Sequence, residues 1–189
     1  MNEKTFEIST NTNFSLYYFK YPIITPYDIS TKEYLKIKYI HNLVVFKEFT
    51  KYNNKPLVNL SFGVIEANEN PLKMVLTGNI EHLQMNDMAK PANIDYGKVL
   101  NTVAKCALQF IKIYPEAMIY FQGSTVSRTR LYRRMINLNL TRINKHFNVY
   151  VVNSWNNTTR TKRLILLPFS RNTNCTGFVI EQKPTRITK

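Results

Sequence analysis

The chain has 189 residues, of which 44% are hydrophobic and 13% aromatic. This composition argues against intrinsic disorder and a fibrous repeat, because the chain can bury a substantial core. The abundance of Tyr, Phe, Ile, Val, Thr and Asn favours a sheet-rich fold over a helical bundle. The length predicts a single domain over residues 1–189, without internal repeats.

Positive charge is concentrated in the last third of the chain. The sequence contains 26 basic and 12 acidic residues, a net charge of +14. Residues 123–189 hold 13 of the basic residues and a single acid, Glu181. Such a block attracts polyanions, of which nucleic acid is the commonest, over the roughly 8–10 Å that salt screening allows. A basic, solvent-exposed face without a partner is the alternative.

The first half of the chain is predicted to form strands. Its aromatic and alternating apolar segments have the length and composition of strands. Pro22 is expected to end the first of them, and a turn near His41 and Asn42 to interrupt the second. The predicted strands cover residues 14–21, 35–39, 43–46, 57–65 and, as a short one, 72–76.

A first helix is predicted from about Asp95 to Tyr114. Asn93 or Asp95 supplies the N-cap oxygen, and Pro115 ends the helix. Apolar residues follow spacings of three and four, which predicts one buried stripe against a sheet. That stripe consists of Tyr96, Val99, Leu100, Val103, Ala107, Phe110, Ile111 and Tyr114.

A short apolar strand at 118–121 leads through a turn into a second predicted helix, Val126–Asn139, with Thr125 as its N-cap. Leu131, Met135 and Leu138 are expected to form its apolar row, widened by Tyr132 and Ile136. The remaining elements are closing strands at 147–152, 164–169 and 177–180. Together these elements predict an α+β fold: an antiparallel or mixed β-sheet with two main helices packed on one face.

The segment Phe121-Gln122-Gly123-Ser124-Thr125-Val126-Ser127-Arg128-Thr129-Arg130-Leu131-Tyr132-Arg133 is the most distinctive in the chain. It resembles the F-x-GST-x-x-RTRLYR motif of an uncharacterised family of small bacterial proteins. The family-like region covers about residues 14–152, followed by basic strands and loops at 153–189. Val126 departs from the Pro that is common in the family. The resemblance implies a fold and a focal motif, and no reaction.

The focal motif is predicted to bind phosphate at Gly123–Arg130. A strand, the turn Gly123-Ser124-Thr125 and a helix start bring backbone N–H groups together at the positive end of a helix dipole. Gly123 permits a close approach or a positive φ, and Arg128 lies in the first turn. In the alternative, the motif is purely architectural: Thr125 caps the helix, and Arg130 or Arg133 pairs with an acid such as Glu116 or Asp95.

The sequence favours a nucleic-acid-binding protein, and RNA over duplex DNA, because no duplex-reading motif is visible. Arginines along the second helix suit bidentate contacts to a phosphate backbone. Trp155 lies among cations and suits base stacking, although burial against the sheet edge is equally compatible. The predicted binding residues are Gly123, Ser124, Thr125, Arg128, Arg130, Tyr132, Arg133, Arg134, Trp155, Arg160, Lys162 and Arg163.

Two other functions stay open on the sequence alone. A toxin-like, metal-independent ribonuclease or other phosphate-ester enzyme would centre on Ser124, Arg128 and Arg130, with His146 or Tyr132 as proton donor. A bacterial interaction subunit would instead use its cationic face to bind an acidic protein. No metal-ligand spacing or cofactor motif is present. Two cysteines, the absence of an apolar leader and the lack of a membrane span predict a cytoplasmic protein without membrane contact.

Overall fold

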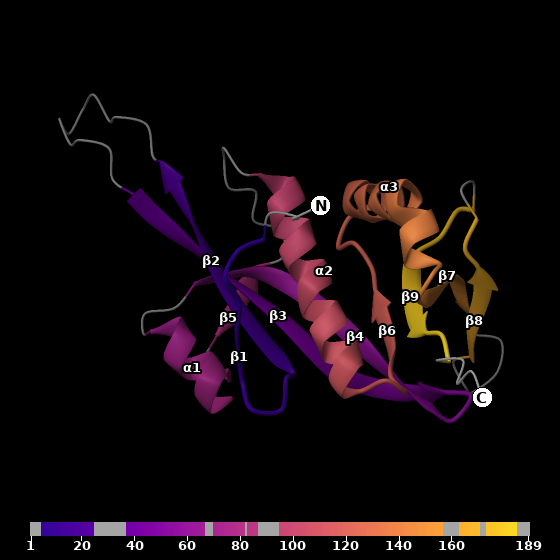
Figure 1. Cartoon of the computed structure of the whole chain (residues 1–189), viewed down its shortest axis with the longest axis horizontal. Helices are drawn as coiled ribbons and strands as arrows, with labels where there is room; N and C mark the ends of the chain where they lie inside the picture. The colour runs from indigo at the N-terminus through magenta and orange to yellow at the C-terminus, as the bar shows by residue number, and fades with distance from the viewer. Residues whose placement is uncertain are drawn as a thin grey trace. The chain divides into compact units, whose positions relative to one another are not determined.

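The computed structural model describes residues 5–24, 37–66, 70–81, 83–86, 95–156, 163–170 and 173–184. These residues form nine strands and three helices (Figure 1): β1 (Ser9–Thr10), β2 (Leu16–Ile24), β3 (Ile37–Tyr52), β4 (Lys55–Glu66), α1 (Pro71–Thr77), β5 (Gln84–Asn86), α2 (Tyr96–Ile113), β6 (Met118–Phe121), α3 (Val126–Ile143), β7 (Phe147–Asn156), β8 (Arg163–Pro168) and β9 (Gly177–Gln182). The predicted α+β class is therefore confirmed, in that the chain combines a β-sheet with helices.

The strands are hydrogen-bonded in the order β1-β2-β3-β4-β6-β9-β7-β8, with β5 paired to β4. The sheet is mixed, as one of the predicted alternatives: β6 runs parallel to β4 and antiparallel to β9. The chain divides into two compact units, which are described separately. Unit 1 comprises Met1–Phe46 and Ser61–Ile113, and unit 2 comprises Lys47–Leu60 and Tyr114–Lys189. Strands β3 and β4 contribute residues to both units, joined by the turn Asn53–Asn54 with positive φ at both residues.

Unit 1 has a helix on each face of its strands. Side chains of β2 alternate between the two faces. Leu16 and Tyr18 belong to a buried cluster with Val75 of α1. On the other face Tyr17 contacts Phe46, whose ring stacks on Phe110 of α2 at a centroid distance of 4.2 Å. α2 itself begins as predicted, since the Asp95 carboxylate accepts a hydrogen bond from Lys98 N–H.

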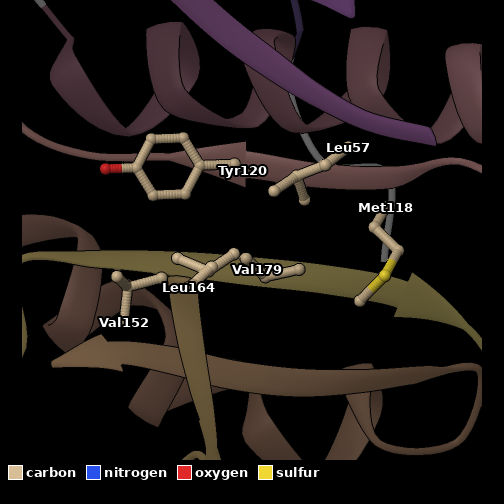
Figure 2. Close-up of a cluster of buried hydrophobic side chains, with 6 residues drawn as sticks. All are labelled: Leu57, Met118, Tyr120, Val152, Leu164 and Val179. Carbon is tan, nitrogen blue, oxygen red and sulfur yellow. The ribbon is translucent and has the colours of Figure 1, made fainter. Parts of the chain in front are cut away.

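Unit 2 also has two apolar faces, and α3 covers one of them. There Ile136 of α3 packs with Val149, Val151 and Phe178. The opposite face holds a second cluster, drawn in Figure 2, to which five strands contribute. It consists of Leu57 of β4, Met118 and Tyr120 of β6, Val152 of β7, Leu164 of β8 and Val179 of β9. The predicted strand at 118–121 is thus central, between β4 and β9.

Two strand boundaries differ from the prediction. Pro22 does not end β2, which continues to Ile24 with Pro22 opposite Tyr39. Within the described residues, β1 pairs only with Tyr17 and Tyr18, so no described strand pairs with β2 on that side at Pro22, and a strand edge tolerates proline. The predicted turn near His41 and Asn42 is also wrong, because β3 is continuous from Ile37 to Tyr52. His41 is accommodated in the strand by a 2.6 Å hydrogen bond between its Nδ1 and the Tyr18 hydroxyl.

The short strand predicted at 72–76 is a helix, α1. Asn70 is its N-cap, accepting hydrogen bonds from Leu72 and Lys73 N–H. Pro71 occupies the first turn, and Gly78 ends the helix with φ +75°, a left-handed conformation that suits glycine. These capping residues override the strand-like run of apolar side chains between them.

The buried row of α3 also differs from the prediction. Leu131 and Leu138 of the expected apolar row are 36% and 71% exposed. The residues that pack against the strands are instead Tyr132, Ile136, Leu140 and Ile143. Because Leu140 and Ile143 take part in this packing, α3 extends one turn beyond the predicted end at Asn139.

Candidate nucleic-acid interface

The turn between β6 and α3 forms the helix start that the sequence predicts. Thr125 has extended backbone angles, φ −133° and ψ 159°, and its hydroxyl oxygen accepts a 3.2 Å hydrogen bond from Arg128 N–H. The Thr129 hydroxyl donates to the Thr125 carbonyl at 3.2 Å. No acidic residue lies in the first turn of α3. The positive end of the helix dipole is therefore not neutralised by a carboxylate of its own turn.

Gly123 is required by a close approach within the turn. A Cβ atom built at Gly123 would lie 2.3 Å from Thr129 N and 2.7 Å from the Arg128 carbonyl carbon. Positive φ is not the reason, since Gly78 is the glycine with positive φ in the described part of the chain. The atoms that approach Gly123 belong to α3 itself. This glycine thus has an architectural role, whatever the turn binds.

We expect Gly123→Ala to destabilise the protein by about 1–3 kcal/mol, the usual cost of forcing extra volume into a packed site. The obstructing atoms are helix backbone, which cannot rotate away as a side chain would. Thermal unfolding of the variant beside the wild type measures the effect. Gly97→Ala is a suitable control: the added Cβ would meet a side-chain atom, the Asp95 carboxylate oxygen at 3.2 Å, which needs to shift by only a few tenths of an ångström. Alanine is also favoured over glycine within a helix, so we expect no loss of stability there. Equal melting temperatures for the Gly123 variant and the wild type would contradict the close approach.

Arg128 folds back over the turn. Its Nη1 donates a 2.8 Å hydrogen bond to the Ser124 hydroxyl oxygen in an exposed position. Arg128 is half-buried, and Ser124 is exposed. A guanidinium, a hydroxyl and the first amides of α3 therefore lie at one end of the helix. A phosphate group can accept hydrogen bonds from donors of these types.

The other arginines of α3 fall into two groups. Arg130, Arg134 and Arg142 are exposed, and Arg130 and Arg134 are four residues apart on one side of the helix. Arg133 is half-buried, and its Nη1 donates to the Thr173 carbonyl at 3.4 Å. Among the residues that the structure describes, neither Arg130 nor Arg133 forms an ion pair with Asp95 or Glu116. The structural pairing that the architectural alternative invoked is thus missing from this part of the chain.

Tyr132 lies on the packed side of α3. Its ring contacts Phe121 edge-on at a centroid distance of 6.0 Å, and it belongs to the cluster around Ile136. The residue is half-buried. This position makes Tyr132 part of the packing between α3 and the strands.

The remaining predicted residues are placed only in part. Trp155 lies in β7, opposite Leu164, and Arg163 begins β8 opposite Asn156; their side chains are outside the described atoms. Arg160 and Lys162 lie outside the described residues. The choice between base stacking and burial for Trp155 therefore stays open, and the structure brings together only the residues of the turn and of α3.

Sequence reasoning missed a polar network around Glu181. The Lys55 ammonium lies 2.6 Å from Glu181 Oε1, the Tyr150 hydroxyl donates to Oε2 at 2.9 Å, and Asn148 donates to Oε2 at 3.4 Å. Burial raises the pKa of Glu181, but the hydrogen bonds from Lys55, Tyr150 and Asn148 outweigh it, so the net pKa is lowered. The signal in the sequence was a lone acid on a strand in a basic segment. Its three donors mark it as a structural ion, held in unit 2 by strands β4, β7 and β9.

Burial raises the pKa of both cysteine thiols. Cys106 and Cys175 are free, and burial raises the pKa of Cys106 to about 12, which keeps its thiol protonated. No group of three or more His, Cys, Asp or Glu side chains in the described ranges is arranged to hold a metal ion. None of the helices described is long and apolar enough to cross a membrane.

Charge follows the division into units. By sequence, unit 2 contains 16 basic and 3 acidic residues, a net charge of +13, whereas unit 1 has 10 basic and 9 acidic residues, a net charge of +1. Within unit 2, α3 carries five arginines and no acid. These features define an α+β protein with one strongly cationic unit.

The chain belongs to a family of unknown function, DUF6934, whose model matches residues 30–183. This match confirms the resemblance to an uncharacterised family, and it reaches further towards the C-terminus than the predicted region of 14–152. No curated protein and no solved structure shows significant similarity to the chain.

Proposed function

We propose that the protein binds RNA through the exposed side and the N-terminal end of α3. The observation that carries this proposal is the pair Arg130 and Arg134, exposed on one side of a helix that contains no acid. A carboxylate three or four residues from an exposed arginine stabilises a helix. α3 contains no such carboxylate, and an anion of another molecule would take its place.

The spacing along α3 suits an extended phosphate backbone. Arg130 and Arg142 are separated by roughly 18 Å along the helix at 1.5 Å per residue. Arg128 and Ser124 extend the same series of donors to the N-terminal end of the helix, where the dipole favours an anion. We place the first phosphate at Ser124 and Arg128, and the following ones at Arg130, Arg134 and Arg142.

Single-stranded RNA is the partner that we propose, ahead of duplex DNA. The sequence contains no helix-turn-helix or zinc-finger signature, which are the usual motifs for base-specific recognition of duplex DNA. The basic segment 157–162 and Trp155 would extend the interface, with Trp155 stacking on a base, as a further part of the proposal.

The proposal predicts that Arg130→Ala combined with Arg134→Ala weakens binding of a labelled single-stranded RNA about tenfold or more, equivalent to about 1.4 kcal/mol. Fluorescence anisotropy with the full chain measures the affinity. The melting temperature should stay nearly unchanged, because exposed charges contribute about 0–1 kcal/mol to folding. Lys73→Ala with Lys105→Ala is the matched control: it removes the same charge from exposed positions of unit 1. Equal losses in both double variants would contradict a site on α3.

The same assay separates the alternatives that the sequence leaves open. A phosphate-ester enzyme would shorten the RNA in the absence of divalent metal, whereas a binding protein leaves it intact. Polyglutamate is a competitor without phosphate groups. If it displaces RNA at equal charge concentration, the interface recognises charge alone, and an acidic protein becomes the better candidate for its partner.

Two further expectations belong to this proposal. We place the protein in the cytoplasm, which agrees with two free thiols. The packing of both main helices on one face of the sheet stays a prediction from the sequence.

A further inference from the structure

Among the described residues, β8 forms an open edge of the strands of unit 2. It pairs with β7 on one side, and it is the last strand in the hydrogen-bonded order. No described strand pairs with its other side. The other terminal strands, β1 and β5, are two and three residues long, whereas β8 has six residues.

The pairing with β7 determines which backbone groups face the open edge. Phe169 N–H donates to the Val149 carbonyl at 3.0 Å, and Leu167 is opposite Val151. Since inward and outward groups alternate along an antiparallel strand, Leu166 presents its N–H and C=O groups to the open edge. The register shift between Val152 and Trp155 adds its extra residue to β7, so the alternation along β8 continues and Leu164 also faces the open edge. Apart from the ladder with β7, no hydrogen bond involves Leu164–Pro168 in the described structure.

The side chains of β8 do not protect this edge. Ile165 and Leu167 are 37% and 41% exposed. Natural proteins block open edges with charged residues, Pro or bulges. β8 has a charged residue and a Pro only at its two ends, Arg163 and Pro168, and the irregularity in its pairing lies in β7, between Val152 and Trp155. Four apolar residues in sequence, Leu164 to Leu167, lie between them. A strand with this composition is a template for another extended segment.

We propose that the open edge of β8 binds an extended, acidic segment of another protein as an additional strand. The backbone of Leu164 and Leu166 would supply the hydrogen bonds, and Ile165 with Leu167 would contact alternate apolar side chains of that segment. The charge of unit 2, +13, favours an acidic segment and opposes a second copy of this chain, which would bring an equal positive charge to the edge. The inference does not rest on the arginines of α3. Of the proposed RNA interface, only the extension over Trp155 and residues 157–162 adjoins β8, since Trp155 pairs opposite Leu164.

The test uses the full chain and a labelled peptide of about eight alternating glutamate and valine residues, blocked at both ends. We expect saturable binding in fluorescence anisotropy. Amide hydrogen exchange, followed residue by residue by NMR, should slow at Leu164 and Leu166 when the peptide is added. The amides of Ile165 and Leu167 face β7 and should change little. Binding without protection of Leu164 and Leu166 would overturn the proposal.

Two variants at one position separate the backbone from the side chain. Leu166→Ala and Leu166→Pro both shorten the side chain, but only Leu166→Pro removes the outward N–H. We expect the peptide to bind about tenfold more weakly to Leu166→Pro than to Leu166→Ala. If Leu166→Pro does not fold, Leu167→Lys replaces it. Strand addition predicts weaker binding to Leu167→Lys, whereas simple charge attraction predicts tighter binding and would refute the inference.

Two remaining measurements complete the test. Sedimentation that shows a dimer of the wild type, dissociated by Leu167→Lys, would assign the edge to a second copy and overturn the acidic segment. RNA affinity measured on the Leu166→Ala variant should equal that of the wild type. A loss of RNA binding there would show that the peptide and RNA compete for one surface, which would contradict a site on β8 separate from the arginines of α3.

Discussion

Phe110→Ala is expected to reduce the free energy of unfolding by about 3–5 kcal/mol, the usual cost of removing a buried aromatic ring. Phe110 is 5% exposed, and its ring stacks on Phe46 at 4.2 Å. The variant would leave a cavity between α2 and the strand that carries Phe46. Since most domains are stable by only about 5–15 kcal/mol, this is a large fraction of the total.

Urea denaturation of the wild type and the variant measures the difference. Leu108→Ala is the matched control, because Leu108 lies on the same helix and is 41% exposed. We expect that control to change the free energy of unfolding by about 0.5 kcal/mol or less. If the Phe110 and Leu108 variants have the same denaturation midpoint, the assignment of the buried face of α2 is wrong.

RNA affinity is expected to fall by roughly 300-fold to 1,000-fold between 50 and 200 mM salt, if about six phosphates are contacted. The cause is the release of counterions from the phosphate backbone when cationic side chains replace them. Anisotropy titrations at four or five salt concentrations give the slope of the logarithm of affinity against the logarithm of salt concentration. A flat response would remove the electrostatic basis of the proposed interface.

The arginine variant sharpens this measurement. Each lost contact to a single-stranded phosphate should reduce the slope by about 0.7, so Arg130→Ala with Arg134→Ala should reduce it by about 1.4. The Lys73 and Lys105 control should leave the slope unchanged, since those lysines lie in unit 1. A similar reduction in both variants would mean that RNA responds to net charge and not to α3.

Sequence patterns predict most of the helices and strands of this fold. They fail where signals in the same short segment favour different elements. The cap at Thr125 and the start of α2 after Asp95 follow from hydrogen bonds within one turn, so local sequence suffices to predict them. The prediction of a strand in place of α1 is wrong because the apolar run of this segment resembles a strand. Asn70, Pro71 and Gly78 are residue types that begin and end helices, and they would have indicated a helix. The tolerance of β2 for Pro22 depends on how far β1 extends, which no local pattern contains.

For the site, the concentration of positive charge, the family-like motif and the helix start at Thr125 can be predicted from the sequence. Which side of α3 is packed depends instead on contacts with residues far away in the chain. Apolar residues occupy more than half of the circumference of this helix, so Leu131 with Leu138 and Tyr132 with Ile136 are both plausible rows. Contact with Val149, Val151 and Phe178 selects the second row, and thereby leaves Arg130, Arg134 and Leu138 exposed. The edge of β8 is likewise a property of strand order, which is set by long-range pairing between residues far apart in the chain.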